Sequence, residues 1–72
     1  MKNYFAKKAV QDVIAEVGDE VIRTSVERRG AITIVIHSAV KPVITGVVRT
    51  PKQRRSFVEM AVSHTHRYHA SV

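Results

Sequence analysis

The residues best suited to chemistry form a basic cluster in the last third of the sequence, made of Arg49, Lys52, Arg54 and Arg55. The cluster surrounds the start of a predicted helix, where unpaired backbone N–H groups and the helix dipole already favour an anion. Lysine and arginine there would contact phosphates, which sets affinity and register without reading bases. The cluster therefore predicts contact with a nucleic-acid backbone; a solvated first helical turn is the simpler interpretation.

A second group of arginines lies around a predicted hairpin and consists of Arg23, Arg28 and Arg29. A basic hairpin tip can enter a groove or contact a nucleic-acid backbone. Glu27 partly neutralises this group, and arginines at a turn are commonly just exposed. In the nucleic-acid hypothesis these residues, together with Arg67, assist the main cluster.

Three histidines near the C-terminus, His64, His66 and His69, are candidate ligands for Zn²⁺ or Ni²⁺. In an extended segment His64 and His66 would share a face, whereas in a helix no pair has the i, i+4 spacing of a two-histidine site. His37 could approach, but no fourth ligand is evident. We therefore expect a solvated tail without a metal, in which Tyr68 could stack on a base.

Catalytic signatures are missing from the sequence. It has no cysteine, no glycine-rich phosphate loop and no paired-carboxylate motif. Asp12 and Glu16 lie one helical turn apart on a polar face, which favours solvation. His37 and Ser38 are neighbours in sequence, which is not the geometry of a base and its nucleophile. We expect a binding protein without enzymatic activity or cofactor.

Length and charge narrow the class of protein. Seventy-two residues make one domain, and no run is apolar enough for a membrane span or a signal peptide, so we expect a soluble cytoplasmic protein. The net charge is +6, with +1 in residues 1–36 and +5 in residues 37–72. Such asymmetry is typical of a protein with one polyanion-facing half.

The first two thirds of the chain predict one helix and three strands. Apolar residues recur at helical spacing over residues 4–17, with Asn3 as N-cap and Gly18 as a left-handed C-terminal residue. Alternation and β-branched residues predict strands over about 20–27, 31–38 and 43–49. Gly30 would take a positive φ in a turn, and Gly46 would mark a bulge or a close contact.

The final third is ambiguous between a helix and a strand over residues 51–64, followed by a flexible tail at 65–72. Thr50 as N-cap, Pro51 at the first position and Gln53 three residues after the cap form a capping box. Yet the apolar residues from 58 to 62 also alternate, as in a strand. We favour the helix.

The expected fold is therefore α+β, in the order αβββα, with a three-stranded antiparallel sheet covered by helices on one face. The alternative is αββββ, with the last segment as a fourth strand. Thr33, Val35, Val43 and Val47 on the other face are too apolar for free exposure. We expect a second copy of the chain to cover this face or to pair with a sheet edge.

The element order and the basic start of the last helix are similar to those of the double-stranded-RNA-binding domain, whose second helix presents basic residues to phosphates. A strand followed by a basic helix also resembles the small arm-binding domains of phage integrases. The lysine-rich start and alanine ladder of the first family are absent, because Phe57 and Met60 occupy that stretch. No family is assigned on these features.

Together these features predict a small nucleic-acid-binding accessory protein that acts as a homo-oligomer. The nucleic acid would be DNA or RNA, held mainly through its phosphates. The alternative is an adaptor or inhibitor, of the kind encoded by phages and mobile elements, that binds a host protein. A basic stripe as wide as a groove would favour nucleic acid, whereas an apolar patch rimmed by charge would favour a protein partner.

Overall fold

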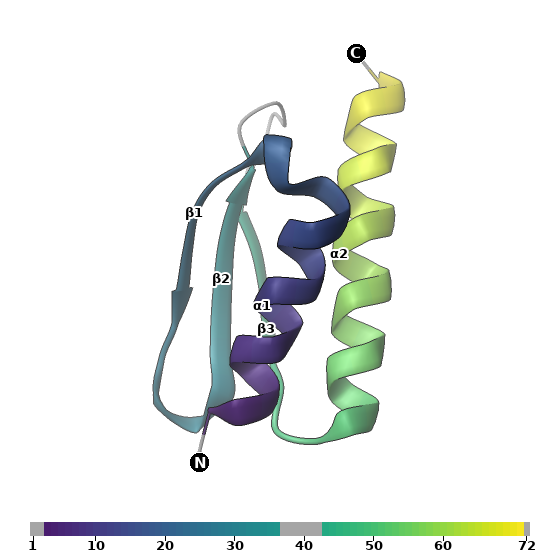
Figure 1. Ribbon diagram of the computed structural model, residues 1–72. Coiled ribbons are helices and arrows are strands. Elements are labelled where there is room, and N and C mark those ends of the chain that lie inside the picture. Colours follow the sequence, from purple (N-terminus) through teal and green to yellow (C-terminus); the bar gives the residue numbers. More distant parts are fainter. Residues whose placement is uncertain (1–2, 37–42, 72) are drawn as a thin grey trace.

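The computed structural model describes residues 3–36 and 43–71, with side chains described up to residue 66. Within these ranges the chain forms two α-helices and three strands in the order α-β-β-β-α (Figure 1). Their bounds are α1 Tyr4–Val17, β1 Val21–Val26, β2 Ala31–Ile36, β3 Val43–Val47 and α2 Pro51–Ser71. Short 3₁₀ turns at Gly18–Glu20 and Arg28–Gly30 precede β1 and β2. The predicted αβββα order is confirmed.

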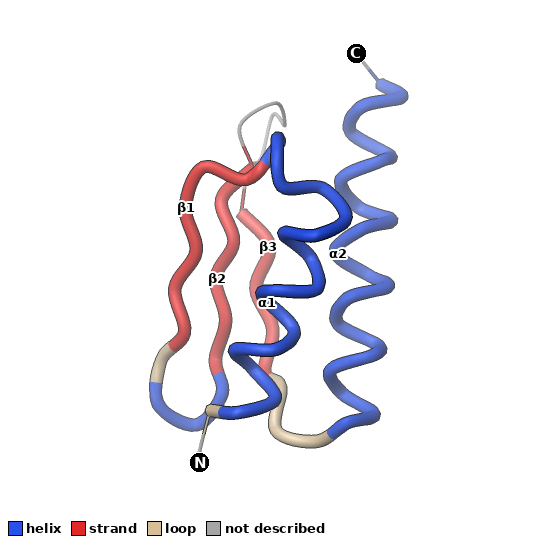
Figure 2. Tube along the Cα trace, in the orientation of Figure 1, coloured by secondary structure: helices blue, strands red, loops and turns tan. Residues whose placement is uncertain are grey.

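The three strands form one antiparallel sheet in the order β1-β2-β3, and both helices lie on the same side of it (Figure 2). The core lies between helices and sheet, where α1 packs on β1 and β2 while α2 packs on α1 and β3. Neither described helix is long and apolar enough to cross a membrane. The buried hydrophobic residues are Ala6, Ala9, Val10, Val13, Val17, Ile32, Ile34, Ile36, Ile44, Val48, Phe57 and Ala61.

Strand bounds agree with the prediction to within two residues where the structure describes them. The third strand ends at Val47, because the chain must then turn into α2, although the Val48 N–H still donates to the Gly30 carbonyl at 2.9 Å. The first strand contains a bulge between Val21 and Arg23. Residues 37 and 38, predicted to end the second strand, lie outside the described residues.

The two ends of α1 differ from the prediction. Asn3 is the N-cap residue, but its side chain makes no capping hydrogen bond. Gly18 is not left-handed: its φ of −50° and ψ of −38° are helical, because the chain continues directly into the 3₁₀ turn. The helix therefore depends on its buried apolar face more than on its caps.

The segment after Thr50 is a helix, so the alternative fourth strand is wrong. The Gln53 N–H donates to Thr50 Oγ1 at 3.1 Å, as an N-cap requires. The Gln53 side chain accepts from the Arg49 N–H at 2.7 Å, whereas a standard capping box would bond the N–H of the cap residue itself. Two neighbouring donors are thus satisfied at the helix start.

The helix also runs beyond residue 64, through Ser71, so most of the predicted tail is helical. Phe57, Ala61 and Thr65 are buried at four-residue spacing on its inner face. Thr65 is a polar residue in this stripe, and its hydroxyl donates to the Ala61 carbonyl at 2.9 Å. Because this hydrogen bond satisfies the hydroxyl group within the helix, Thr65 can be buried. The buried stripe of α2 therefore continues past residue 64, where the helix was predicted to end.

Gly46 lies beneath the ring of Phe57, which confirms the predicted close contact. A Cβ atom at Gly46 would be 2.6 Å from Phe57 Cδ1, far inside van der Waals distance. The pairing of Gly46 with Ile32 continues the regular β2–β3 register, so there is no bulge. Glycine therefore lets α2 approach β3 closely.

The sheet face opposite the helices is uncovered in the described chain. The register places Val43 beside Val35, and Val47 beside Ala31, on this face. Val43 and Val47 are 51% and 53% exposed, and Ile22 at the β1 bulge is 59% exposed. The sequence-based expectation of an apolar outer face thus agrees with the exposure of these side chains.

We predict that Gly46→Ala destabilises the fold by about 1–3 kcal/mol, because the added methyl group overpacks the contact with Phe57. In a domain of this size each kcal/mol corresponds to a fall of roughly 4–8 °C in Tm. Gly18→Ala is the control, since its Cβ would meet only Ile14 Cγ2 at 3.5 Å. That helical position should gain about 0.4–1 kcal/mol. Equal Tm values for the two variants would contradict the packing argument.

We also predict that Thr50→Ala lowers the free energy of unfolding by about 1 kcal/mol, because the Gln53 N–H loses its acceptor. Thr50→Ser keeps a hydroxyl in the same place and should retain most of the stability. Urea denaturation followed by circular dichroism measures both variants. A Thr50→Ala variant as stable as the parent would show that α2 does not depend on this cap.

Candidate nucleic-acid interface

The β1–β2 turn places two arginines at one end of the molecule. Arg29 and Gly30 have φ values of 67° and 76°, so the chain reverses through two left-handed residues. The Glu27 N–H donates to the Ala31 carbonyl at 2.8 Å and closes the turn. A Cβ at Gly30 would lie 2.3 Å from the Val48 carbonyl oxygen, so the turn is docked against the end of β3.

Arg49 joins the turn to the start of α2. Its Nε donates to the Arg29 carbonyl at 2.8 Å, and its backbone N–H donates to Gln53 Oε1 at 2.7 Å. Two predicted groups of arginines, one at the hairpin and one before the last helix, therefore meet here. Because the bond to Arg29 uses only Nε, the other guanidinium nitrogens of Arg49 keep their donor capacity.

A hollow of about 760 Å³ lies between these segments and is lined by Asn3, Arg28, Arg29 and Arg49. None of the four lining residues is acidic. The side-chain oxygen of Asn3 is buried without a hydrogen-bond partner among the described residues. The hollow thus presents guanidinium groups from two segments that are about twenty residues apart in the sequence.

The start of α2 lies at the same end of the molecule as the β1–β2 turn and the start of α1 (Figure 1). Lys52 and Arg55 are exposed in its first turns. The helix dipole adds to their positive potential there. We use "basic end" for the set Arg28, Arg29, Arg49, Lys52 and Arg55.

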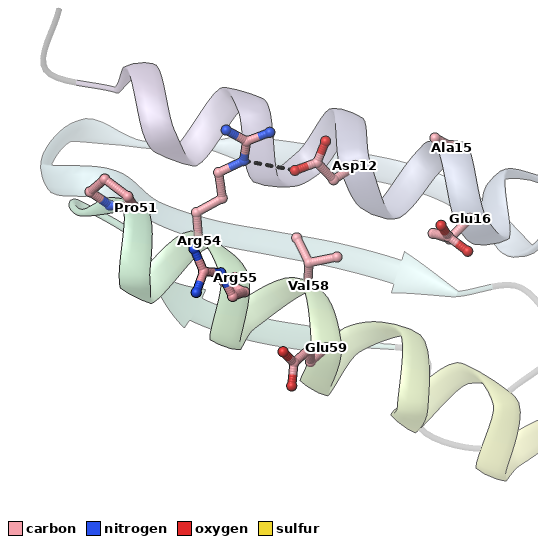
Figure 3. A pocket seen from close by; sticks show the side chains of 8 residues that line it. All are labelled: Asp12, Ala15, Glu16, Pro51, Arg54, Arg55, Val58 and Glu59. Atoms are coloured by element: carbon pink, nitrogen blue, oxygen red, sulfur yellow. Dashed lines mark hydrogen bonds and ion pairs between the residues drawn. The ribbon is translucent and has the colours of Figure 1, made fainter.

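Arg54, predicted as part of the basic cluster, is paired within the protein instead. Figure 3 shows its side chain reaching from α2 to α1, where Nε lies 2.7 Å from Asp12 Oδ2. The hydrogen bond to Asp12 raises the pKa of Arg54, so the ion pair further favours a guanidinium that is protonated in any case. Asp12, noted above beside Glu16, therefore anchors α2 to α1, and its carboxylate compensates the charge on Arg54.

The cleft around this ion pair has mixed charge. Its lining residues, labelled in Figure 3, include Arg54 and Arg55 together with Asp12, Glu16 and Glu59. The acidic residues of α1 and the mixed charges of α2 make this cleft a poor surface for a polyanion. The hollow at the β1–β2 turn is the more uniformly basic of the two.

Two of the predicted site residues lie away from the basic end. Arg23 is opposite Val35 in the β1–β2 register, on the uncovered sheet face and far along the strand from the turn. Arg67 lies in the C-terminal part of α2, about 22 Å along the helix axis from Lys52 at 1.5 Å per residue. The structure therefore does not bring either residue to the hollow.

The three candidate metal ligands all lie on α2. His64 and His66 are two residues apart, so they project from different sides of the helix. Among the described residues, no group of three histidine, cysteine, aspartate or glutamate side chains is placed to hold a metal. The side chain of His69 and all of His37 lie outside the described residues.

Asn3 was predicted only as a helix cap, and its place in the hollow was missed. No local pattern could have revealed it, because its neighbours Arg28 and Arg49 are distant in sequence. Only the docking of the β1–β2 turn against the end of β3 brings these residues together.

The basic end therefore combines three chain segments: the β1–β2 turn, the connection after β3 and the start of α2. Its donors are guanidinium and ammonium groups, and hydrogen bonds of Arg49 link the turn to the start of α2. Such a surface can accept several anionic oxygens at once. No known protein family, no curated protein and no solved structure matches this chain.

Proposed function

We propose that this protein binds nucleic acid through its basic end, mainly by contacts to phosphates, and has no catalytic role. The observation that carries the proposal is the convergence of Arg28, Arg29 and Arg49 on one hollow, whose described lining residues include no acidic one. Lys52 and Arg55 extend the positive surface along the start of α2. Guanidinium groups match phosphate oxygens in geometry as well as charge.

A polyanion fits this hollow better than a small neutral ligand. Its volume of about 760 Å³ lies in the range of small-molecule sites, but such sites are mainly apolar. Here the described lining residues are three arginines and an asparagine. Lining of this kind favours a ligand that brings several negative charges, as consecutive phosphates do.

The αβββα order supports the same proposal by resemblance. In the double-stranded-RNA-binding domain, the second helix presents basic residues to phosphates across a groove. Here the start of α2 carries Lys52 and Arg55 at the same end as the arginine turn. Phosphate contacts give strong salt dependence and little sequence preference.

We predict that the triple variant Arg28→Gln, Lys52→Gln, Arg55→Gln binds more weakly and with a shallower salt dependence. All three side chains are exposed, so the fold should be retained. Each lost phosphate contact reduces the slope of log K against log [salt] by about 1, so the triple variant should lose about 3. Fluorescence anisotropy with duplex DNA, duplex RNA and single strands, each over a salt series, measures the slopes.

Arg23→Gln is the single-charge control, because Arg23 lies on the sheet and away from the basic end. Its salt slope should equal that of the parent protein. Arg54 is left unchanged, since its loss would also break the ion pair with Asp12. A parent protein that binds none of the polymers at low salt would overturn the proposal. A triple variant with the parental slope would refute the assignment of the basic end.

Self-association is the second part of the proposal. The uncovered sheet face carries Val35, Val43 and Val47, and the latter two are more than half exposed. A second copy placed on this face would remove these side chains from water and raise stability by mass action. It would also supply a second basic end to the same assembly, which increases avidity for a long polyanion.

We predict that the protein sediments at more than its chain mass of 8.1 kDa at micromolar concentration, and that Val43→Lys shifts it to the monomer. Ile14→Lys is the control, because Ile14 is 43% exposed on α1 and not on the sheet face. Sedimentation velocity separates the species. A monomeric parent protein, or dissociation by both variants alike, would contradict an interface on this face.

A further inference from the structure

The outer edge of β3 is unpaired in the described chain. The sheet order is β1-β2-β3, so β3 is an edge strand. The bond from the Val48 N–H to the Gly30 carbonyl fixes which residue pairs exchange hydrogen bonds. Since such pairs alternate along an antiparallel ladder, Gly46 and Ile44 bond to β2, and the backbone groups of the residues between them point outward.

Val43, Thr45 and Val47 therefore offer a row of N–H and C=O groups at this edge. All three side chains are also exposed. A row of this kind is a ready template for one further strand. The β1 edge lies close to α1 instead, whereas the β3 edge lies close to α2.

A groove runs between this edge and α2, and we call it the edge groove. Among the described residues it is lined by Gly46, Val47, Lys52, Gln53, Ser56, Phe57 and Met60. Its surface is mainly apolar, and Met60 is 42% exposed there. The missing side chain at Gly46 and the flat ring of Phe57 form its floor.

We propose that the edge groove binds an extended segment of a partner protein, which adds to the sheet as a strand beside β3. Backbone groups of Val43, Thr45 and Val47 pair with the segment. Alternate apolar side chains of the segment enter the groove against Phe57 and Met60. An acidic residue at the end of the segment nearest Val47 meets the Lys52 ammonium group.

The charge at the groove selects this occupant over the β3 strand of a second copy. Among the described lining residues Lys52 is the one that carries a charge, and the start of α2 adds its dipole. A second β3 strand, VITGV, has no acidic residue and is followed by Val48 and Arg49, so it offers nothing to neutralise Lys52. A partner strand with a carboxylate complements both the backbone edge and the charge.

The inference does not rest on nucleic-acid binding. The hollow at the basic end lies between the β1–β2 turn and Arg49, whereas the edge groove lies between β3 and α2. Lys52 is shared by the basic end and the groove, so the test must separate its two roles.

A random eight-residue peptide library displayed on phage is panned against the full 72-residue protein, and the selected peptides are synthesised with a fluorescent label. We expect alternating apolar residues with aspartate or glutamate at one end. Binding should perturb the amide NMR signals of Val43, Thr45 and Val47. N-methylation of alternate peptide amides should abolish binding, because it removes the donors that pair with the edge.

Lys52→Glu should weaken peptide binding about tenfold or more through like-charge repulsion, as for a close charge pair. Arg55→Glu is the matched control, because this substitution reverses the same charge only three residues away. The Arg55 side chain lines the cleft that faces α1 and is not among the residues that line the edge groove. Its effect should stay within about twofold. Met60→Lys should also abolish binding, and circular dichroism checks that each variant is folded.

Failure to select any peptide, or peptides that tolerate N-methylation, would overturn the proposal. If Lys52→Glu and Arg55→Glu weakened peptide binding equally, the effect would be one of overall charge and not of a contact in the groove. That result would also overturn the proposal. Signals of the β3 edge that shift with protein concentration alone, and that no peptide displaces, would assign the edge to a second copy. Complete displacement of the peptide by an oligonucleotide that itself perturbs the β3 signals would assign the groove to nucleic acid and overturn the proposal.

Discussion

The contact between Phe57 and the backbone at Gly46 is the constraint on which the arrangement of this small fold depends. It allows α2 to lie closer to β3 than any other residue at position 46 would permit. Because α1 packs beside α2 on the same face of the sheet, the position of α2 also determines how the two helices meet. The groove beside β3 and the location of the helix start both follow from this approach.

Positive charge has two different uses in this protein. Arg54 is a structural cation, since it joins α2 to α1 through Asp12. At the other side of the helix start, Arg49 holds the main chain of the turn and still presents the rest of its guanidinium group. Two arginines five positions apart thus have different roles: Arg54 stabilises the contact between the helices, whereas Arg49 contributes to an outward-facing surface that can bind anions.

Most of the fold could be predicted from local patterns, because the patterns of the first helix and of the strands each had one physical interpretation. The apolar stripe of residues 4–17 predicts α1, and the β-branched run from Ile32 to Ile36 predicts β2. Residues 51–64 were ambiguous because their apolar residues fit both periods. The buried stripe through Phe57 and Ala61 continues to Thr65. Because Thr65 is polar, the pattern of apolar residues alone predicted a helix that was too short.

The candidate site was only partly predictable, because it depends on contacts between distant segments. The sequence grouped Arg23 with Arg28 and Arg29, but the strand carries Arg23 to another part of the sheet. It grouped Arg54 with Arg55, but an acidic residue 42 positions earlier pairs with Arg54. No local signal identifies such a partner. The docking of the turn at Gly30 against Val48 likewise becomes visible only in the folded chain.

The left-handed conformation of Arg29 has an evolutionary consequence. An L-residue other than glycine in this region is destabilised by roughly 1–2 kcal/mol, and Arg29 has a φ of 67° next to a glycine that is also left-handed. Selection for thermal tolerance alone would move position 29 toward glycine or asparagine. Retention of arginine there would show that lineages carrying this protein accept a weaker fold in return for a cation at the tip of the turn.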